Sequence, residues 1–173
     1  MYAIDMRNIT KRFPGVLAND QIDFQVEKQD IHCLLGENGC GKTTLMNVLF
    51  GLYHQDEGEV YIHGKKAEIQ NPNDAYRLGI GMVHQHFMLV NQMTVLENII
   101  MGNECGNYFL DRKASAAAVQ ELIDRFGFQL DLKSKVADLS VGTKQRIEIV
   151  KTLYRGADII ILDEPTAVLT PQE

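Results

Sequence analysis

One eight-residue stretch constrains the fold of this 173-residue chain more than any other feature. Residues 36–43, Gly-Glu-Asn-Gly-Cys-Gly-Lys-Thr, fit the pattern G-x-x-x-x-G-K-[ST], in which glycines let successive backbone N–H groups point at phosphate oxygens. A short apolar run, 31–35, precedes it, and a helical stretch follows over 42–50 with Gly51 as the stop. The sequence therefore predicts a buried strand, a phosphate-binding loop and a helix, with a plain glycine-rich turn as the alternative.

The residues of this loop have individual predicted roles. Lys42 can reach the β- and γ-phosphates of a nucleotide, the Thr43 hydroxyl can bind Mg²⁺, and Thr44 can donate to a phosphate. The N-terminus of the following helix adds a positive partial charge. Cys40 is expected to be an unusually reactive thiol that MgATP protects from maleimide, or else only a tolerated small residue. The expected nucleotide-binding residues of the loop are Gly36, Asn38, Gly39, Cys40, Gly41, Lys42, Thr43 and Thr44.

The order of the other apolar runs predicts an α/β fold. Residues 22–26 alternate apolar and polar, which predicts a half-exposed strand, and 58–62 predict a further strand. Buried strands are expected at 31–35, 80–84 and 158–162, separated by helices, which indicates a mostly parallel sheet. The mostly helical stretch between the last two strands is then an insertion or a subdomain.

Two carboxylates end the last of these strands. In the run 159–164, Ile-Ile-Ile-Leu-Asp-Glu, Asp163 could hold Mg²⁺ through water, opposite Thr43. Glu164 could polarise the water that attacks the γ-phosphate. The carboxyl ends of parallel strands are where α/β folds place their chemistry, although acids also end strands merely for solubility.

Composition narrows the classes of partner. The net charge is −6, from 17 basic and 23 acidic side chains, which argues against a nucleic acid as partner. No run of about 18 apolar residues is present, so no segment is expected to span a membrane. The cysteines, Cys33, Cys40 and Cys105, have no metal-ligand spacing and fit free thiols in a reducing compartment.

Two further motifs make the chain resemble the ATP-binding cassette (ABC) family. Residues 139–146, Leu-Ser-Val-Gly-Thr-Lys-Gln-Arg, resemble the LSGGQ signature of that family, and Gln85 resembles its glutamine loop. With the phosphate loop and 159–166, these motifs occur in the family's order, and the resemblance covers essentially the whole chain. Within the family, the chain looks closest to the N-terminal cassette of the ATPase subunits of simple-sugar and nucleoside importers.

The resemblance implies roles for residues outside the loop. Phe13 matches the aromatic residue that stacks on adenine, unless it is an ordinary core phenylalanine. Gln85 matches the residue that contacts the magnesium and nucleophile region and relays nucleotide state to membrane subunits, with a surface glutamine as the alternative. Ser140 and Gly142 match residues that close over the γ-phosphate bound by a second cassette, or they only cap a helix. The expected catalytic residues are Gln85 and Glu164, and the expected metal-binding residues are Thr43, Gln85 and Asp163.

The resemblance also implies a P-loop NTPase fold of the ABC type, with an N-terminal antiparallel β subdomain and a helical signature subdomain. The expected boundaries are 1–86 for the β subdomain and phosphate-loop core, 87–155 for the helical subdomain, and 156–173 for the acidic strand and the loop after it. The last four residues, 170–173, form a capping box that announces a helix, and no histidine follows Glu164 to act as the family's switch histidine. The chain is therefore expected to be one incomplete, C-terminally truncated ABC domain.

The implied function is that of an ATP-binding and ATP-hydrolysing subunit of an ABC importer, with ATP and Mg²⁺ as cofactors and a nucleoside or simple sugar as solute. The implied partners are two transmembrane permease subunits, a second ABC cassette and, indirectly, an extracytoplasmic solute-binding protein, at the cytoplasmic face of the cell membrane. Val141 and Thr143 depart from the signature, so a regulatory half that binds ATP in a degenerate site is one alternative. A non-transport ABC ATPase is another. This chain alone is expected to be inactive or weakly active.

Overall fold

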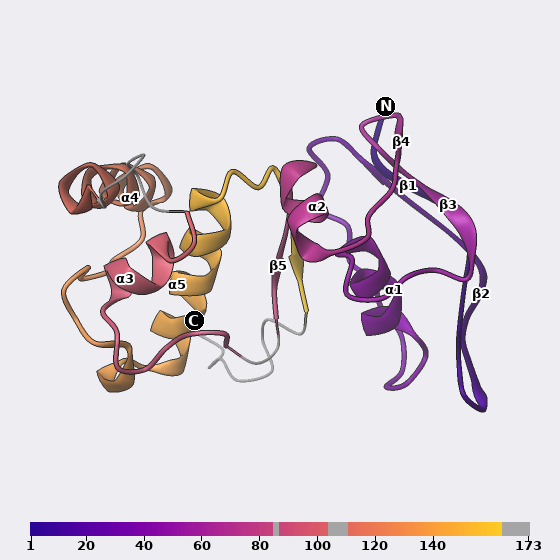
Figure 1. The fold of residues 1–173 in the computed structure, drawn as a ribbon, viewed down its shortest axis with the longest axis horizontal. Coiled ribbons are helices and arrows are strands. Elements are labelled where there is room, and N and C mark those ends of the chain that lie inside the picture. The colour runs from indigo at the N-terminus through magenta and orange to yellow at the C-terminus, as the bar shows by residue number, and fades with distance from the viewer. Residues whose placement is uncertain (85–86, 104–110, 164–173) are drawn as a thin grey trace. The chain divides into compact units, whose positions relative to one another are not determined.

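The computed structural model describes residues 1–84, 87–103 and 111–163 of the chain (Figure 1). The chain divides into two compact units, Met1–Ile80 and Gly81–Glu173, and each is described by itself. Among the described residues, none of the helices has the length and apolarity that crossing a membrane requires. The subdomain boundaries expected after residues 86 and 155 stay a prediction.

The framework of the first unit is an antiparallel sheet of four strands: β1 (Tyr2–Phe13), β2 (Val16–Glu27), β3 (Glu57–Ile62) and β4 (Lys65–Ala67). In the sheet they lie in the order β2-β1-β3-β4. The expected N-terminal antiparallel subdomain is therefore confirmed, as are strands over 22–26 and 58–62. Over the last half of β2, partly buried residues alternate with exposed ones, as the sequence predicts.

Two helices of the first unit begin and end where local chemistry predicts. They are α1 (Lys42–Leu49) and α2 (Pro72–Arg77). α1 follows the phosphate loop and stops before Gly51, whose φ of 79° only glycine adopts readily. Asn71 caps the start of α2, because its side chain accepts hydrogen bonds from the backbone N–H groups of Asn73 and Asp74.

The apolar run 31–35 is not a strand, so the prediction of a buried strand there is wrong. Ile31 is 98% exposed and Leu35 is 83% exposed. A strand is stable only beside a neighbour that takes its hydrogen bonds, and no described strand pairs with this run. Apolar composition alone could not reveal this, because burial of a run depends on what lies on both sides of it.

The second unit combines a two-stranded sheet with helices. The sheet pairs β5 (Ile80–Val83), which begins at the boundary, with β6 (Ile159–Leu162), and Figure 1 draws both strands running in the same direction. Both expected strands are therefore confirmed, but the described part of their sheet has two strands instead of three. The sequence predicts that this strand is buried on both faces. Ile160 and Leu162 are instead 37% and 47% exposed, so β6 is buried on one face only.

Three helices and a 3₁₀ turn of the second unit share one apolar core. The elements are α3 (Val95–Ile100), α4 (Arg112–Phe126), η1 (Val136–Asp138) and α5 (Val141–Tyr154). The helix expected to start after Ser140 is confirmed, because Ser140 caps α5. The buried residues of this core are Val95, Ile99, Ile100, Val119, Ile123, Val136, Ile147 and Val150.

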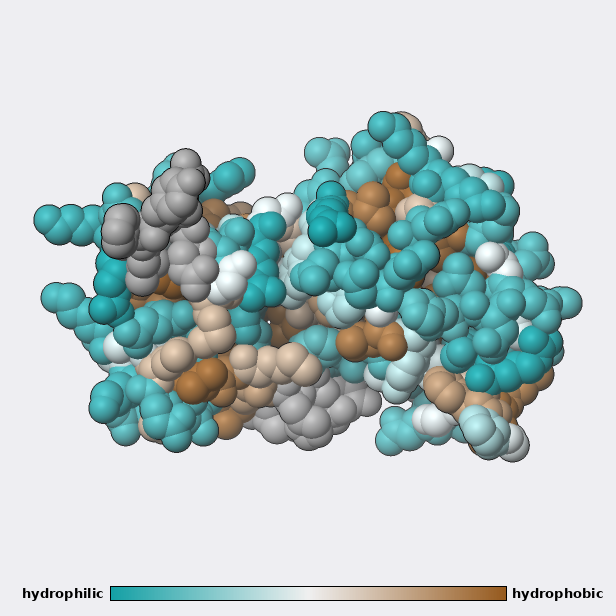
Figure 2. Space-filling view, viewed as in Figure 1, coloured by the Kyte–Doolittle hydropathy of each residue, from teal (hydrophilic) through white to brown (hydrophobic). Residues whose placement is uncertain are grey.

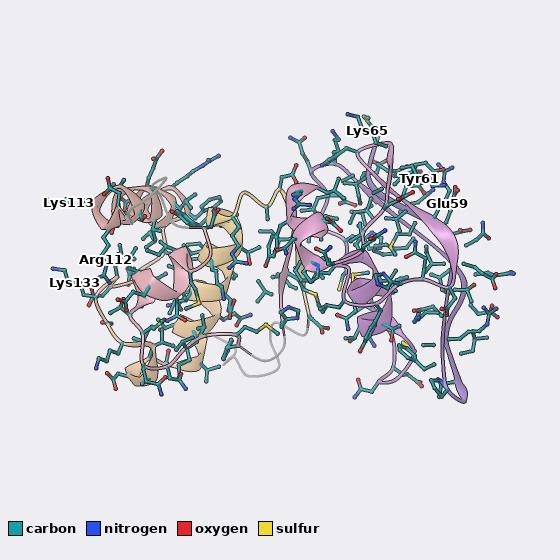
Figure 3. All side chains as sticks on the ribbon, in the orientation of Figure 1. Glu59, Tyr61, Lys65, Arg112, Lys113 and Lys133 are labelled. Carbon is teal, nitrogen blue, oxygen red and sulfur yellow. The ribbon has the colours of Figure 1, made fainter. Side chains whose placement is uncertain are left out.

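Charged side chains cover much of each unit. Figure 2 shows mostly hydrophilic residues on the visible face, with apolar residues in small patches. In the first unit, Glu59 and Tyr61 extend from β3 (Figure 3); the Tyr61 hydroxyl and Lys66 Nζ both donate to the Glu59 carboxylate, at 2.7 and 2.6 Å. In the second unit, Arg112 at the start of α4 forms an ion pair with Glu97 of α3. These contacts tie neighbouring elements together at the surface of each unit.

Candidate nucleotide-binding site

Glycines shape the loop that leads into α1. Gly39 and Gly41 have φ angles of 84° and 91°, a backbone region that residues with a Cβ rarely adopt. A Cβ on Gly41 would lie 2.2 Å from the carbonyl oxygen of Ala18 in β2, which is a steric clash. Gly41 is therefore required both for its dihedral angle and for the close approach of the loop to β2.

The ammonium of Lys42 lies across this loop. Lys42 Nζ donates to the carbonyl oxygens of Gly36 and Glu37, each at 2.8 Å, and lies 3.6 Å from Cys40 Sγ. A Cβ on Gly36 would come within 2.8 Å of Cys40 Sγ, so the small size of Gly36 makes room for this arrangement. A cation held at a fixed place beside a glycine-rich loop is suited to an anionic group such as phosphate.

The N-terminus of α1 fits an anion for a second reason. Its N-cap is Gly41, which has no side chain to accept from the first N–H groups, and the first turn contains no acidic residue. The partial positive charge of the helix end is therefore not offset by a side chain of α1 itself. Thr43 is exposed and Thr44 half-buried in this first turn, and Asn38 is exposed in the loop. The donors present thus fit the phosphates of a nucleotide.

β2 contributes a residue that the sequence analysis did not single out. Asn19, 5% exposed, donates from Nδ2 to the Gly41 carbonyl oxygen at 3.2 Å. Its Oδ1 is buried and has no partner among the described residues. Asn19 is followed directly by two more polar residues, Asp20 and Gln21, so nothing in the local sequence distinguishes it.

Phe13, at the end of β1, is half-buried and is not part of the buried core. Its ring lies against the ring of Tyr53 in a T-shaped contact, with centroids 5.3 Å apart. Lys11 Nζ lies over the same ring, 5.5 Å from its centroid. The partial exposure argues against an ordinary core phenylalanine, while contact with a base stays a prediction.

The second unit contains the acidic strand end and the signature. Asp163 follows β6 and is half-buried, and its backbone N–H donates to the Val83 carbonyl oxygen at 3.1 Å. Ser140 Oγ accepts from the backbone N–H of Thr143 at 3.3 Å, and Gly142 is buried in the first turn of the signature helix α5. Ser140 is therefore a helix cap, and its role towards phosphate stays a prediction.

A pair of α5 side chains holds the segment after Gln85. Glu148, 6% exposed, accepts from the backbone N–H of Met88 at 2.7 Å, and Lys151 Nζ donates to the Met88 carbonyl oxygen at 3.0 Å. Sequence reasoning missed this pair because the partners are 60 and 63 residues apart. The helix that carries the signature thus also holds the backbone of Met88.

Two predicted catalytic residues, Gln85 and Glu164, lie outside the described residues, as does Cys105. Within the first unit, the structure brings Gly36, Cys40 and Lys42 together at the loop. The roles expected for all these residues stay predictions.

Comparisons with known proteins agree with these motifs. The sequence pattern described as "ABC transporter" matches residues 19–167. The guanosine import ATP-binding protein NupO of Bacillus subtilis (strain 168) is 60% identical over 173 residues, covering 99% of this chain and 34% of that protein. The nucleoside import ATP-binding protein NupA of Lactococcus lactis subsp. cremoris (strain MG1363) is 54% identical over 171 residues, covering 98% and 34%. The chain thus spans about a third of the length of these curated relatives (34%).

Solved structures show the same fold. The ADP conformation of an ATP-binding cassette from an ABC transporter matches with a TM-score of 0.84 at 29% identity, covering 99% of this chain and 72% of that one. A nucleotide-free ATP-binding cassette matches with a TM-score of 0.83 at 29% identity, over the same shares of the two chains. The expected P-loop NTPase fold of the ABC type is confirmed, and the chain belongs to the ABC transporter family.

Proposed function

We propose that this chain is the ATP-binding and ATP-hydrolysing part of an ABC importer subunit that drives uptake of a nucleoside or a simple sugar. The observation that carries the proposal is the ammonium of Lys42, held across the glycine loop at the uncapped N-terminus of α1. Membership of the ABC family makes ATP the nucleotide. The relatives whose names specify guanosine or nucleoside import support the choice of solute.

In this proposal the first unit binds ATP. The backbone N–H groups of the loop and the ammonium of Lys42 neutralise the triphosphate, and Thr44 donates a further hydrogen bond. The ring of Phe13 stacks on the adenine. The loop residues assigned to the nucleotide are Gly36, Asn38, Gly39, Cys40, Gly41, Lys42, Thr43 and Thr44.

The proposed hydrolysis involves a metal site and an activated water. Bound Mg²⁺ would offset charge on the phosphate oxygens, and Thr43, Gln85 and Asp163 are the residues assigned to hold it. Glu164, with Gln85, is assigned to orient and polarise the attacking water. The oxygen donors in this set suit a hard cation, which prefers hydroxyl, amide and carboxylate ligands.

The proposed partners follow from the importer assignment. Ser140 and Gly142 are assigned to the γ-phosphate bound by a second ABC cassette, because a serine cap and a glycine at a helix start form an anion site. Two transmembrane permease subunits would bind the cassettes at the cytoplasmic face of the cell membrane, with an extracytoplasmic solute-binding protein as an indirect partner. The net charge of −6 argues against nucleic acid as a partner.

Equilibrium binding of a fluorescent ATP analogue tests the phosphate site. The unmodified chain should bind it in competition with ATP, and Lys42→Ala should weaken binding by about 10- to 100-fold, the effect of losing charge-assisted hydrogen bonds. Lys65→Ala on β4 removes an exposed lysine and serves as the matched control. Absence of binding by the unmodified chain, or full binding by Lys42→Ala, would contradict the proposal.

A second candidate function is a regulatory half-site that binds ATP without hydrolysing it. The hydroxyl of Ser140 lies 3.0 Å from that of Thr143, one of the two residues that depart from the signature, and this contact competes with one to the phosphate bound by the second cassette. Glu164→Gln in an assembled transporter separates the two candidates. Loss of transport with ATP still bound supports hydrolysis at this site, whereas unchanged transport supports the regulatory half.

A further inference from the structure

We propose that Lys11 and Tyr53 are positioning residues that hold the ring of Phe13 as a platform for the base of the nucleotide. The inference rests on the proposed ATP-binding function and adds two side chains that no sequence motif indicates. It assigns them to selection of the base, separately from binding of the phosphates.

The ring of Phe13 is held by two neighbours of different chemistry. Tyr53, from the segment after α1, meets it in a T-shaped contact with an interplanar angle of 78°. Lys11, two residues before Phe13 on β1, places its ammonium over the ring. Edge-to-face contact and cation–π attraction are both directional, so together they restrict the orientation of the ring.

Lys11 is itself fixed in place. Its side chain is only 15% exposed, and its Nζ forms an ion pair with Asp56 Oδ1 at 3.1 Å. The other oxygen of Asp56 accepts from the backbone N–H of Arg12 at 2.6 Å, and the Asp56 N–H donates to the Thr10 carbonyl oxygen at 2.8 Å. The segment that carries Tyr53 and Asp56 is therefore bound to the end of β1 that carries Phe13.

A second ring pair in the same unit shows what a purely structural pair looks like. Phe50 and Tyr76 also meet in a T-shaped contact, with centroids 5.4 Å apart, and Phe50 is 2% exposed. Phe13 is instead half-buried, and Tyr53 is 39% exposed. A ring that is oriented by two neighbours and yet remains accessible is suited to stacking with a further planar group, such as a nucleotide base.

Calorimetric titrations with ATP and with inorganic tripolyphosphate, which has the phosphates but no base, test this inference on the full chain. Lys11→Met should weaken ATP binding about two- to fivefold, and Tyr53→Leu about two- to tenfold, with tripolyphosphate affinity unchanged in both. The conservative variants Lys11→Arg and Tyr53→Phe should keep the affinity for ATP, because they retain the cation and the ring.

The controls separate this inference from the proposed function. Phe13→Ala should abolish the difference between ATP and tripolyphosphate, and Lys66→Met, which removes another ion-paired lysine of the first unit, should change neither affinity. Unchanged ATP affinity in Lys11→Met and Tyr53→Leu, or an equal loss for both ligands, would overturn the inference while leaving the phosphate site intact. Binding of neither ligand by the unmodified chain would overturn the proposed function itself.

Discussion

Single residues in the phosphate loop act through backbone geometry as much as through charge. Gly41 combines a left-handed φ with a close approach to Ala18, and Lys42 is tied to the loop by two carbonyl oxygens. Cys40 adds an exposed thiol beside Lys42. Substitution of a single residue in this loop should therefore change the shape of the phosphate site itself.

Gly41→Ala should lower the free energy of unfolding. Backbone strain at this φ alone costs about 1–3 kcal/mol, and the clash of the new Cβ with Ala18 should add to that loss. Gly15→Ala is a matched control, since Gly15 has a φ of 79° and nothing within 4 Å of a Cβ. Urea unfolding of both variants isolates the clash. Equal losses of stability in the two variants would show that the close approach to β2 has no cost.

Cys40 should be protected from maleimide when MgATP is bound, because its Sγ lies beside the Lys42 ammonium at the proposed phosphate site. Cys33 is also exposed but lies before the loop, so its labelling should be unaffected and provides an internal control. Mass spectrometry of the labelled peptides measures the two rates separately. Equal rates for Cys40 with and without MgATP would argue against occupation of the loop.

At the scale of elements, α5 links two motifs that are distant in the sequence. Its N-terminus is the signature capped by Ser140, and Glu148 and Lys151, further along it, hold the backbone of Met88. A helix transmits displacement of one end to the other because its backbone hydrogen bonds make it stiff. The signature at the start of α5 and the backbone of Met88 should therefore move together.

Glu148→Ala should lower the free energy of unfolding by about 1–3 kcal/mol, since it leaves the Met88 N–H without its acceptor and Lys151 without its carboxylate. Glu148→Gln keeps an acceptor of the same shape and should recover much of the loss. Chemical denaturation of the two variants beside the unmodified protein measures the difference. A loss of the same size in Glu148→Gln would mean that the charge, and not the hydrogen bond, stabilises this segment.

In both units, hydrogen-bond donors favour the ionised form of particular carboxylates. The pKa of Asp5 is lowered chiefly by the hydrogen bonds that its carboxylate accepts from Arg7. The pKa of Glu59 is lowered chiefly by a hydrogen bond from Lys66. In the second unit, the capping hydrogen bonds of Thr94 lower the pKa of Glu97. A lowered pKa in the folded state means that each carboxylate stabilises the fold above its unfolded pKa.

The free energy of unfolding should therefore fall as the pH drops below about 4–4.5, where these carboxylates become protonated in the unfolded chain. The stabilisation should be complete near neutral pH and should be lost progressively as the pH passes through the lowered pKa values. Urea unfolding at a series of pH values from 7 to 3 measures this dependence. A stability that does not change below pH 4 would contradict it.

The elements of the molecule could be predicted wherever they depend on neighbouring residues. Asn71 and Ser140 cap helices through N–H groups two or three residues away, and Gly51 ends α1 through its own φ. The run 31–35 could not be assigned correctly, because its apolar residues are consistent with a strand only if another strand lies beside them. The same limit explains why β6 was expected to be buried on both faces.

Motifs and helix caps a few residues long were enough to identify the family and most of the helices and strands, because each of these signals lies within one short stretch of sequence. The residues that support the loop and the signature helix can be identified only in the folded chain. Asn19 reaches Gly41 across 22 residues, and Glu148 reaches Met88 across 60. Such contacts depend on how strands and helices pack, and no local pattern of residues records that packing.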